Sequence, residues 1–134
     1  MNPIDLRFSD AIAKGDLDAI VSFLEAGDVD VNVPDRDGDI ALHTAAKKNH
    51  LNAVELLLSY GASINAVDEE GWTALQEAVL NGNEDIVRVL LKHGADKTIR
   101  NQDGQLALDI AVQHGHAPLV FLLCEGHSIQ YGFY

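Results

Sequence analysis

Six histidines and one cysteine are the side chains of this sequence most suited to metal binding or nucleophilic catalysis. Zinc sites need Cys, His or carboxylate ligands at short spacings, and His93, His114 and His127 have no Cys or carboxylate partner at such a spacing. Cys124 has no adjacent His and Asp that would activate its thiol. The glycines punctuate turns far apart, whereas a phosphate loop needs several glycines in one turn. The sequence therefore predicts no catalytic site, no metal and no cofactor.

Charge is a more informative property of this chain. Its 9 Lys and Arg against 21 Asp and Glu give a formal net charge of -12. Such a charge repels phosphate backbones and anionic lipid. We therefore expect a protein partner with a basic or mixed basic and apolar surface, no nucleic acid and no membrane, and a monomer in solution.

The acidic residues are also unevenly placed. Residues 68–87 contain six acidic residues and no Lys or Arg, whereas residues 88–100 have a net charge of +3. The turn sequences "DRDGD" and "DEEG" are predicted to form an acidic rim that steers a basic segment. The alternative is an ordinary solvated surface.

Length and composition indicate one domain, residues 1–134, with enough apolar residues to build a core. No stretch approaches the ~20 apolar residues of a membrane span, and the N-terminus lacks the pattern of a secretory signal. A single Cys fits a reducing compartment. We expect a cytoplasmic or nuclear protein.

The chain repeats itself with a period of 33 residues. Each unit contains a turn, a short helical stretch, a polar break and a second amphipathic stretch that ends near a glycine. One such helix pair cannot bury its apolar face, so the units must stack. The repeated columns are Gly38, Gly71 and Gly104; Leu42, Leu75 and Leu108; Ala45, Ala78 and Ala111; and Leu57, Leu90 and Leu123.

The stretches "DGDIALHTAAKKNHLNAVELLLSYGASINA", "EGWTALQEAVLNGNEDIVRVLLKHGADKT" and "DGQLALDIAVQHGHAPLVFLL" resemble the ankyrin-repeat family. The resemblance implies an all-α solenoid of stacked helix-turn-helix units joined by β-turn fingers. The expected repeats are residues 1–34, 35–67, 68–100 and 101–134, of which the first and last are atypical capping repeats.

Some family positions differ in this chain. The helix-capping Thr survives only as Thr73, because Ile40 and Leu106 occupy the same position in the second and fourth units. We therefore expect the first helices of those units to be less well capped. His43 matches the family's His, which the resemblance implies is a structural residue that braces a turn.

Ankyrin proteins bind partners through turn tips and inner helices, so the resemblance implies a partner surface on the concave face. The expected partner-binding residues are Arg36, Asp37, Asp39, Lys47, Lys48, Glu69, Glu70, Trp72, Leu80, Asn81, Gln102, Gln105, Gln113 and His114.

Trp72 is the only Trp and lies in a turn. The repeat aligns it with Asp39 and Gln105, and these polar counterparts predict a solvent-facing column. Leu80 is likewise apolar in an otherwise polar column. One interpretation is that Trp72 lies flat over its neighbouring turn while Leu80 fills a gap between helices. The other, which we favour, is that both form the apolar centre of the partner site, ringed by acid.

Two functions remain open. The first is a non-enzymatic interaction protein that acts as an inhibitor, adaptor or chaperone. The second is a targeting or substrate-recognition domain of a larger protein, such as a bacterial effector or an enzyme. The apolar tail residues Tyr131, Phe133 and Tyr134 either cover the exposed end of the last unit or lead into a further segment.

Asn32 is a possible modification site. Its spacing from Leu24 and Asp30 resembles the Asn-hydroxylation sequence of many ankyrin repeats. The alternative, which we favour, is that Asn32 tolerates an unusual turn conformation and hydrogen-bonds locally.

Overall fold

The computed structural model describes the backbone of residues 2–131 and the side chains of residues 2–124. The described residues form eight helices and no strand, which confirms the predicted all-α repeat fold. None of these helices is long and apolar enough to cross a membrane. The helices are α1 (Pro3–Lys14), α2 (Leu17–Ala26), α3 (Ala41–Lys47), α4 (Leu51–Ser59), α5 (Ala74–Leu80), α6 (Glu84–Lys92), α7 (Ala107–Gln113) and α8 (Ala117–Tyr131).

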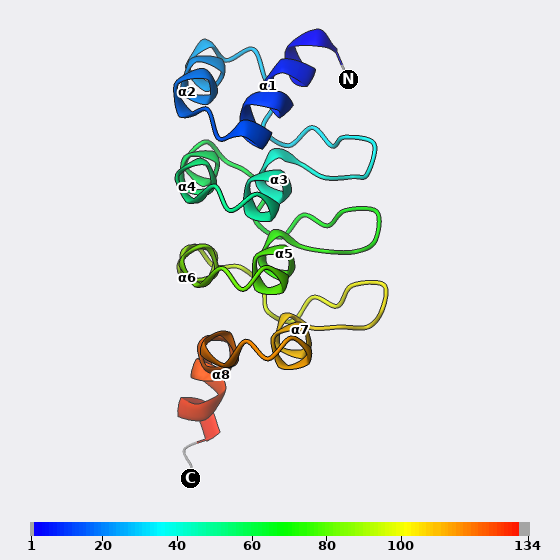
Figure 1. Ribbon diagram of the computed structural model, residues 1–134, viewed down its shortest axis with the longest axis vertical. Helices are drawn as coiled ribbons and strands as arrows, with labels where there is room; N and C mark the ends of the chain where they lie inside the picture. The colour runs from blue at the N-terminus through cyan, green and yellow to red at the C-terminus, as the bar shows by residue number, and fades with distance from the viewer. Residues whose placement is uncertain (1, 132–134) are drawn as a thin grey trace.

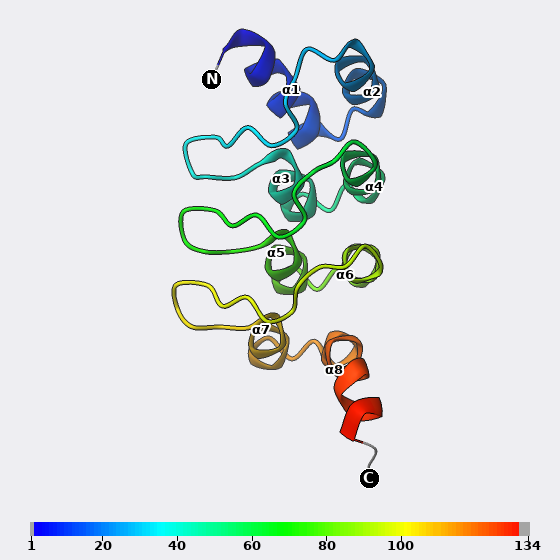
Figure 2. The same ribbon diagram turned by 180° about the vertical axis from the view of Figure 1, so that it is seen from behind.

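The helices form two layers in a linear stack (Figure 1). Helices α1, α3, α5 and α7 make the inner layer, and α2, α4, α6 and α8 make the outer layer. Long loops project from the inner layer to the same side of the stack, and the view from behind shows the same order (Figure 2). The two ends of the described chain lie at opposite ends of the stack.

The stacked units share a core of repeated columns. Ala45, Ala78 and Ala111 are each 0% exposed, and their small side chains let consecutive inner helices approach closely. Leu57 and Leu90 are equally buried in the outer layer. Full burial of one such leucine contributes about 1.5–3 kcal/mol relative to an exposed one. The repeat period therefore identifies the residues that hold the stack together.

The polar breaks between paired helices also tie neighbouring units together. His50 Nε2 hydrogen-bonds to the carbonyl oxygen of Ala13 at 3.0 Å, and His116 Nε2 to that of Leu80 at 3.3 Å. A Cβ atom added to Gly82 would lie 2.9 Å from the His116 ring, so the ring packs directly on the glycine. These histidines thus have a structural role in the repeat.

The caps of the inner helices follow the sequence prediction. Thr73 Oγ1 accepts the backbone N–H of residue 76 at 3.1 Å, whereas Ile40 and Leu106 make no side-chain cap bond. Part of the loss is offset from within the helix, because His43 Nδ1 accepts the N–H of Ile40 and Asp109 Oδ2 accepts that of Leu106. The weaker capping of α3 and α7 is therefore confirmed.

Candidate partner-binding surface

Three projecting loops, residues 35–39, 68–72 and 101–105, are here called the fingers. In the middle finger, Asp68 Oδ1 accepts the N–H groups of Glu70 at 2.9 Å and Trp72 at 3.0 Å. The N–H of Asp68 in turn donates to the Trp72 carbonyl at 3.0 Å. Asp35 and Asn101 make the same bonds in the other two fingers. One carboxylate or amide side chain thus closes each finger.

The fingers also bond to one another. The N–H of Glu69 donates to the Asp37 carbonyl at 3.0 Å, and the N–H of Gln102 donates to the Glu70 carbonyl at 3.0 Å. Gly38 lies at this contact with a φ of 78°, and a Cβ there would lie 2.8 Å from the Glu69 nitrogen. The structure therefore places a row of exposed tip residues along one edge: Arg36, Asp37, Glu69, Glu70 and Gln102.

The column that contains Trp72 is less exposed than predicted, and the prediction is wrong for Asp39. Asp39 is only 6% exposed, and Trp72 and Gln105 are partly buried. The reason is that, in the second and fourth units, the side chain at this repeat position bonds to the side chain eight residues later, on the inner helix. Asp39 Oδ2 accepts a hydrogen bond from Lys47 Nζ at 2.5 Å, and Gln105 Nε2 donates to Gln113 Oε1 at 2.8 Å.

Trp72 and Leu80 occupy the same two positions in the third unit. Both are partly buried and pack against the hydrophobic core. The repeat therefore carries an ion pair in the second unit, two apolar residues in the third, here called the apolar pair, and an amide pair in the fourth. The backbone beneath Trp72 is held as well, because its carbonyl accepts a hydrogen bond from His43 Nε2 at 3.0 Å. This bond and the one to the Ile40 N–H confirm the bracing role predicted for His43.

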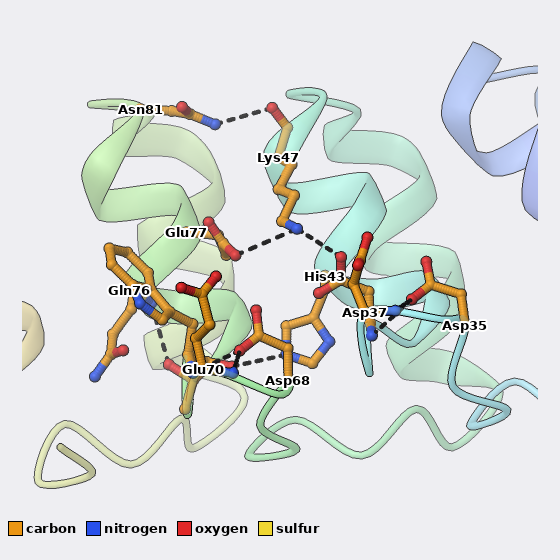
Figure 3. A network of polar contacts seen from close by, with 12 residues as sticks. Asp35, Asp37, His43, Lys47, Asp68, Glu70, Gln76, Glu77 and Asn81 are labelled. Carbon is orange, nitrogen blue, oxygen red and sulfur yellow. Dashed lines mark hydrogen bonds and ion pairs between the residues drawn. The ribbon is translucent and has the colours of Figure 1, made fainter. Parts of the chain in front are cut away.

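A cluster of charges lies between α3 and α5 (Figure 3). The Lys47 ammonium is 2.5 Å from Asp39 Oδ2 and 3.6 Å from Glu77 Oε2. Carboxylate oxygens of Asp39, Asp68 and Glu77 lie within 4.8 Å of one another. The Lys47 ammonium contacts two of these three carboxylates, so acidic groups outnumber basic ones in the cluster.

Burial raises the pKa of Glu77 to about 7, and the charges of Asp68 and Asp39 add to the effect while Lys47 opposes it. Burial also raises the pKa of Asp39, against the opposing hydrogen bond from Lys47. For Lys47, burial disfavours the ammonium, but the bond to Asp39 and the nearby carboxylates outweigh it and raise its pKa.

Sequence reasoning missed Glu77. Its repeat counterparts, Thr44 and Ile110, are uncharged. A charged residue at this position, in the middle of an inner helix, was the signal that could have identified it. The sequence could not show that Asp68, from the finger of the same unit, would lie beside it. Lys47 supplies one positive charge to this cluster, through its contacts with Asp39 and Glu77.

A second carboxylate cluster, Asp35, Asp37 and Asp39, lies in the first finger. Asp35 Oδ1 is already used to accept the N–H groups of Asp37 and Asp39 at 2.8 and 3.0 Å. This cluster is explained by the turn that it closes.

The remaining predicted residues lie at the ends of the inner helices. Asn81 Nδ2 donates to the Lys47 carbonyl at 2.9 Å, which ties α5 to α3. Lys48, Gln113 and His114 are exposed. The structure thus brings the predicted residues onto one face, made of the three fingers and helices α3, α5 and α7 and here called the finger face. Their role in partner binding stays a prediction.

Asn32 joins two units. Its Oδ1 accepts the N–H of Ser63 at 2.8 Å, and its Nδ2 donates to the Gly61 carbonyl at 3.3 Å. Asn65 makes the equivalent bond to the N–H of Asp96 at 2.8 Å. These bonds support a structural role for Asn32, although the side chain bonds to the next unit rather than locally. Hydroxylation of Asn32 stays a prediction.

A family model described as "Ankyrin repeats (3 copies)" matches residues 8–101, and one described as "Ankyrin repeats (many copies)" matches residues 81–123. The chain belongs to the ankyrin-repeat family. Ankyrin repeats form a protein-interaction fold, and this ankyrin-repeat chain is a protein-interaction module.

Two curated proteins are similar to parts of this ankyrin-repeat chain. Protein phosphatase 1 regulatory subunit 27 of Mus musculus is 41% identical over 60 residues, which are 45% of this chain and 39% of that protein. Palmitoyltransferase AKR1 of Candida glabrata is 36% identical over 63 residues, which are 46% of this chain and 8% of that protein. The matched segment is thus a minor part of each relative's length.

Proposed function

We propose that this ankyrin-repeat chain is a non-catalytic regulatory protein, acting as an inhibitor, adaptor or chaperone, that binds a protein partner through the finger face. The observation that carries the proposal is the apolar pair Trp72 and Leu80, placed where neighbouring units have polar pairs. Stacking does not require an apolar pair there, since the second and fourth units use Lys47 with Asp39 and Gln113 with Gln105. A regulatory subunit among its relatives supports this role.

The partner surface should be basic, or basic with an apolar centre. Asp37, Glu69 and Glu70 are exposed on adjacent fingers, next to Trp72. Exposed acidic groups attract a basic partner over distance and raise the association rate more than the lifetime of the complex. Trp is the residue type most often found at the energetic centre of an interface. The acidic tips would thus steer the partner, and the apolar pair would hold it.

The steering part can be tested by charge reversal. We expect the triple variant Asp37→Lys, Glu69→Lys and Glu70→Lys to slow association with a partner captured from the source lysate and to flatten its salt dependence. The matched control reverses three exposed acids on the outer helices α2 and α4: Asp18, Glu25 and Glu55. Both variants change the net charge equally. Equal loss of association rate in the two would show that total charge acts, and not the finger face.

The alternative is that this sequence is the recognition module of a larger protein. The matches cover only 8% and 39% of the relatives' lengths, which is consistent with a repeat module inside a larger protein. An antibody against this chain, used on a lysate of the source cells, would decide. A band near 14.5 kDa supports a free-standing protein, and a larger band supports the alternative.

A further inference from the structure

The net charge of the chain lies entirely in its first two thirds. Residues 1–87 contain 5 Lys and Arg against 17 Asp and Glu, whereas residues 88–124 contain 4 against 3. The net charge of these segments is therefore -12 and +1. The last unit contrasts most sharply, because Asp109 is the only charged residue between positions 105 and 124.

The same end of the stack exposes apolar side chains that are buried in earlier units. Val112 on α7 is 61% exposed, while its repeat counterparts Val79 and Ala46 are each 0% exposed. In the earlier units this position is covered by the inner helix of the next unit, through the contacts of α3 with α5 and of α5 with α7. Val112 is thus a stacking residue without a following unit in the described part of the chain.

Two further columns behave in the same way. Leu108 is partly exposed, although its counterparts Leu42 and Leu75 are 0% and 1% exposed. Val120 on α8 is also partly exposed, in the column of Val87. A groove lined by Leu106, Leu108 and Leu123, with Lys97, Thr98 and Arg100, runs beside them. The end face, defined here as Leu106, Leu108, Val112 and Val120, is therefore apolar, and the groove at Leu106 and Leu108 also carries the cations Lys97 and Arg100.

We propose that a second copy of this chain packs on the end face, so that the protein forms a symmetric dimer through its last units. The interface would continue the stacking contacts that already join α5 to α7 and α6 to α8. A two-fold arrangement uses the same patch on both copies, as an isologous interface requires. It also places the acidic first units of the two copies at the far ends of the assembly.

Electrostatics favour this occupant. The total charge predicts a monomer, because two copies of a strongly acidic chain repel one another. That repulsion is weakest at the end face, which is near-neutral and belongs to the last unit, at the end of the stack opposite α1 (Figure 1). The opposite end differs. Its exposed apolar residue, Leu6 on α1, is 57% exposed and is flanked in the sequence by two charged residues, Asp5 and Arg7.

The test is sedimentation equilibrium of the full chain over a roughly hundredfold range of concentration, since mass action makes a dimer concentration-dependent. We expect wild-type dimers whose dissociation constant does not rise with added salt. Val112→Glu should raise that constant at least about tenfold, because each copy would bury a charge at the contact. The matched control Leu6→Glu, at the acidic end, should leave it unchanged.

Three results would overturn the proposal. The first is a wild type that stays monomeric over the whole range. The second is an equal loss of dimer in the Val112→Glu and Leu6→Glu variants, which would show general charge repulsion. The third is a lower melting temperature of Val112→Glu at concentrations where the wild type is monomeric, which would show that residues 125–134 of the same chain cover the face. None of these results bears on partner binding by the finger face.

Discussion

The middle units and the last unit of this chain share one scaffold and carry different surfaces. The small alanines between inner helices are buried in both regions. At the exposed edge of the inner helices, however, the second and third units hold an ion pair and an apolar pair, while the last unit holds the amide pair of Gln105 and Gln113. The position of Glu77 on α5 is taken by Ile110 on α7. Stacking thus determines the buried columns and leaves the edge free to vary.

The third unit carries a buried carboxylate at a position where the last unit carries an apolar side chain. Glu77 is 8% exposed with a raised pKa, whereas Ile110 is 1% exposed and carries no charge to desolvate. Burial of a carboxylate costs free energy that an apolar side chain of similar size does not. A stability optimum would favour the residues of the last unit. The proposed binding role of this charged and aromatic edge would account for that cost.

The largest expected effect compares two turn glycines. Gly38 and Gly104 have φ values of 78° and 74°, but only Gly38 has a finger packed against it. Gly104→Ala should cost about 1–2 kcal/mol for the left-handed backbone. Gly38→Ala should cost at least ~1 kcal/mol more, because its Cβ would overlap the neighbouring finger. Urea denaturation measures both, and equal losses would mean that the fingers do not support one another.

The second prediction concerns pH and Glu77. In the unfolded chain this carboxyl loses its proton near its ordinary pKa of 4.5, while the folded protein keeps the proton until about pH 7. Unfolding therefore releases a proton between these values, and the contribution of Glu77 to stability falls as the pH rises.

Glu77→Gln removes this titration. The free energy of unfolding of the variant, relative to wild type, should rise by about 1–3 kcal/mol from pH 5 to pH 8. Urea denaturation at a series of pH values gives this difference. A difference that stays flat with pH would show that Glu77 is solvated in the folded protein.

The smallest effect concerns the helix caps. Leu106→Thr should stabilise the last unit by about 0.5–1 kcal/mol, because Leu106 is partly exposed and its position lacks a cap. Ile40→Thr should yield little or no gain, since Ile40 is 5% exposed and the lost burial offsets the new cap. Thermal unfolding of both variants tests the pair. A larger gain for Ile40→Thr would reverse the comparison.

The 33-residue period predicts the helix pairs, the fingers and the buried columns, because these depend on which residue types recur. Thr73 and His43 could also be assigned from the sequence, since a cap and a turn brace bond to nearby or regularly repeated backbone. The local sequence of one unit therefore sets the placement of these elements, and stacking repeats it along the chain.

The burial of Asp39 and Glu77 could not be predicted in this way. Asp39 is a polar residue in a polar column, and it is buried because Lys47 reaches back to it from the inner helix. Glu77 lies beside Asp68, which comes from a finger and not from its own helix. Residue type alone does not report such contacts between a finger and an inner helix. The same limit led to the wrong expectation for Asp39 in the column of Trp72.

The most direct test of the binding account replaces the apolar pair of the third unit by the amide pair of the fourth. The double variant Trp72→Gln and Leu80→Gln copies Gln105 and Gln113, so the fold already accommodates these side chains at the equivalent positions. Phe121→Gln, at an 81% exposed site on the outer helix α8, is the matched control. Titration calorimetry with the captured partner, on samples shown to be folded, gives the affinities. We predict that the double variant binds at least ~30-fold more weakly while the control binds as the wild type does. A folded double variant with wild-type affinity would contradict the account.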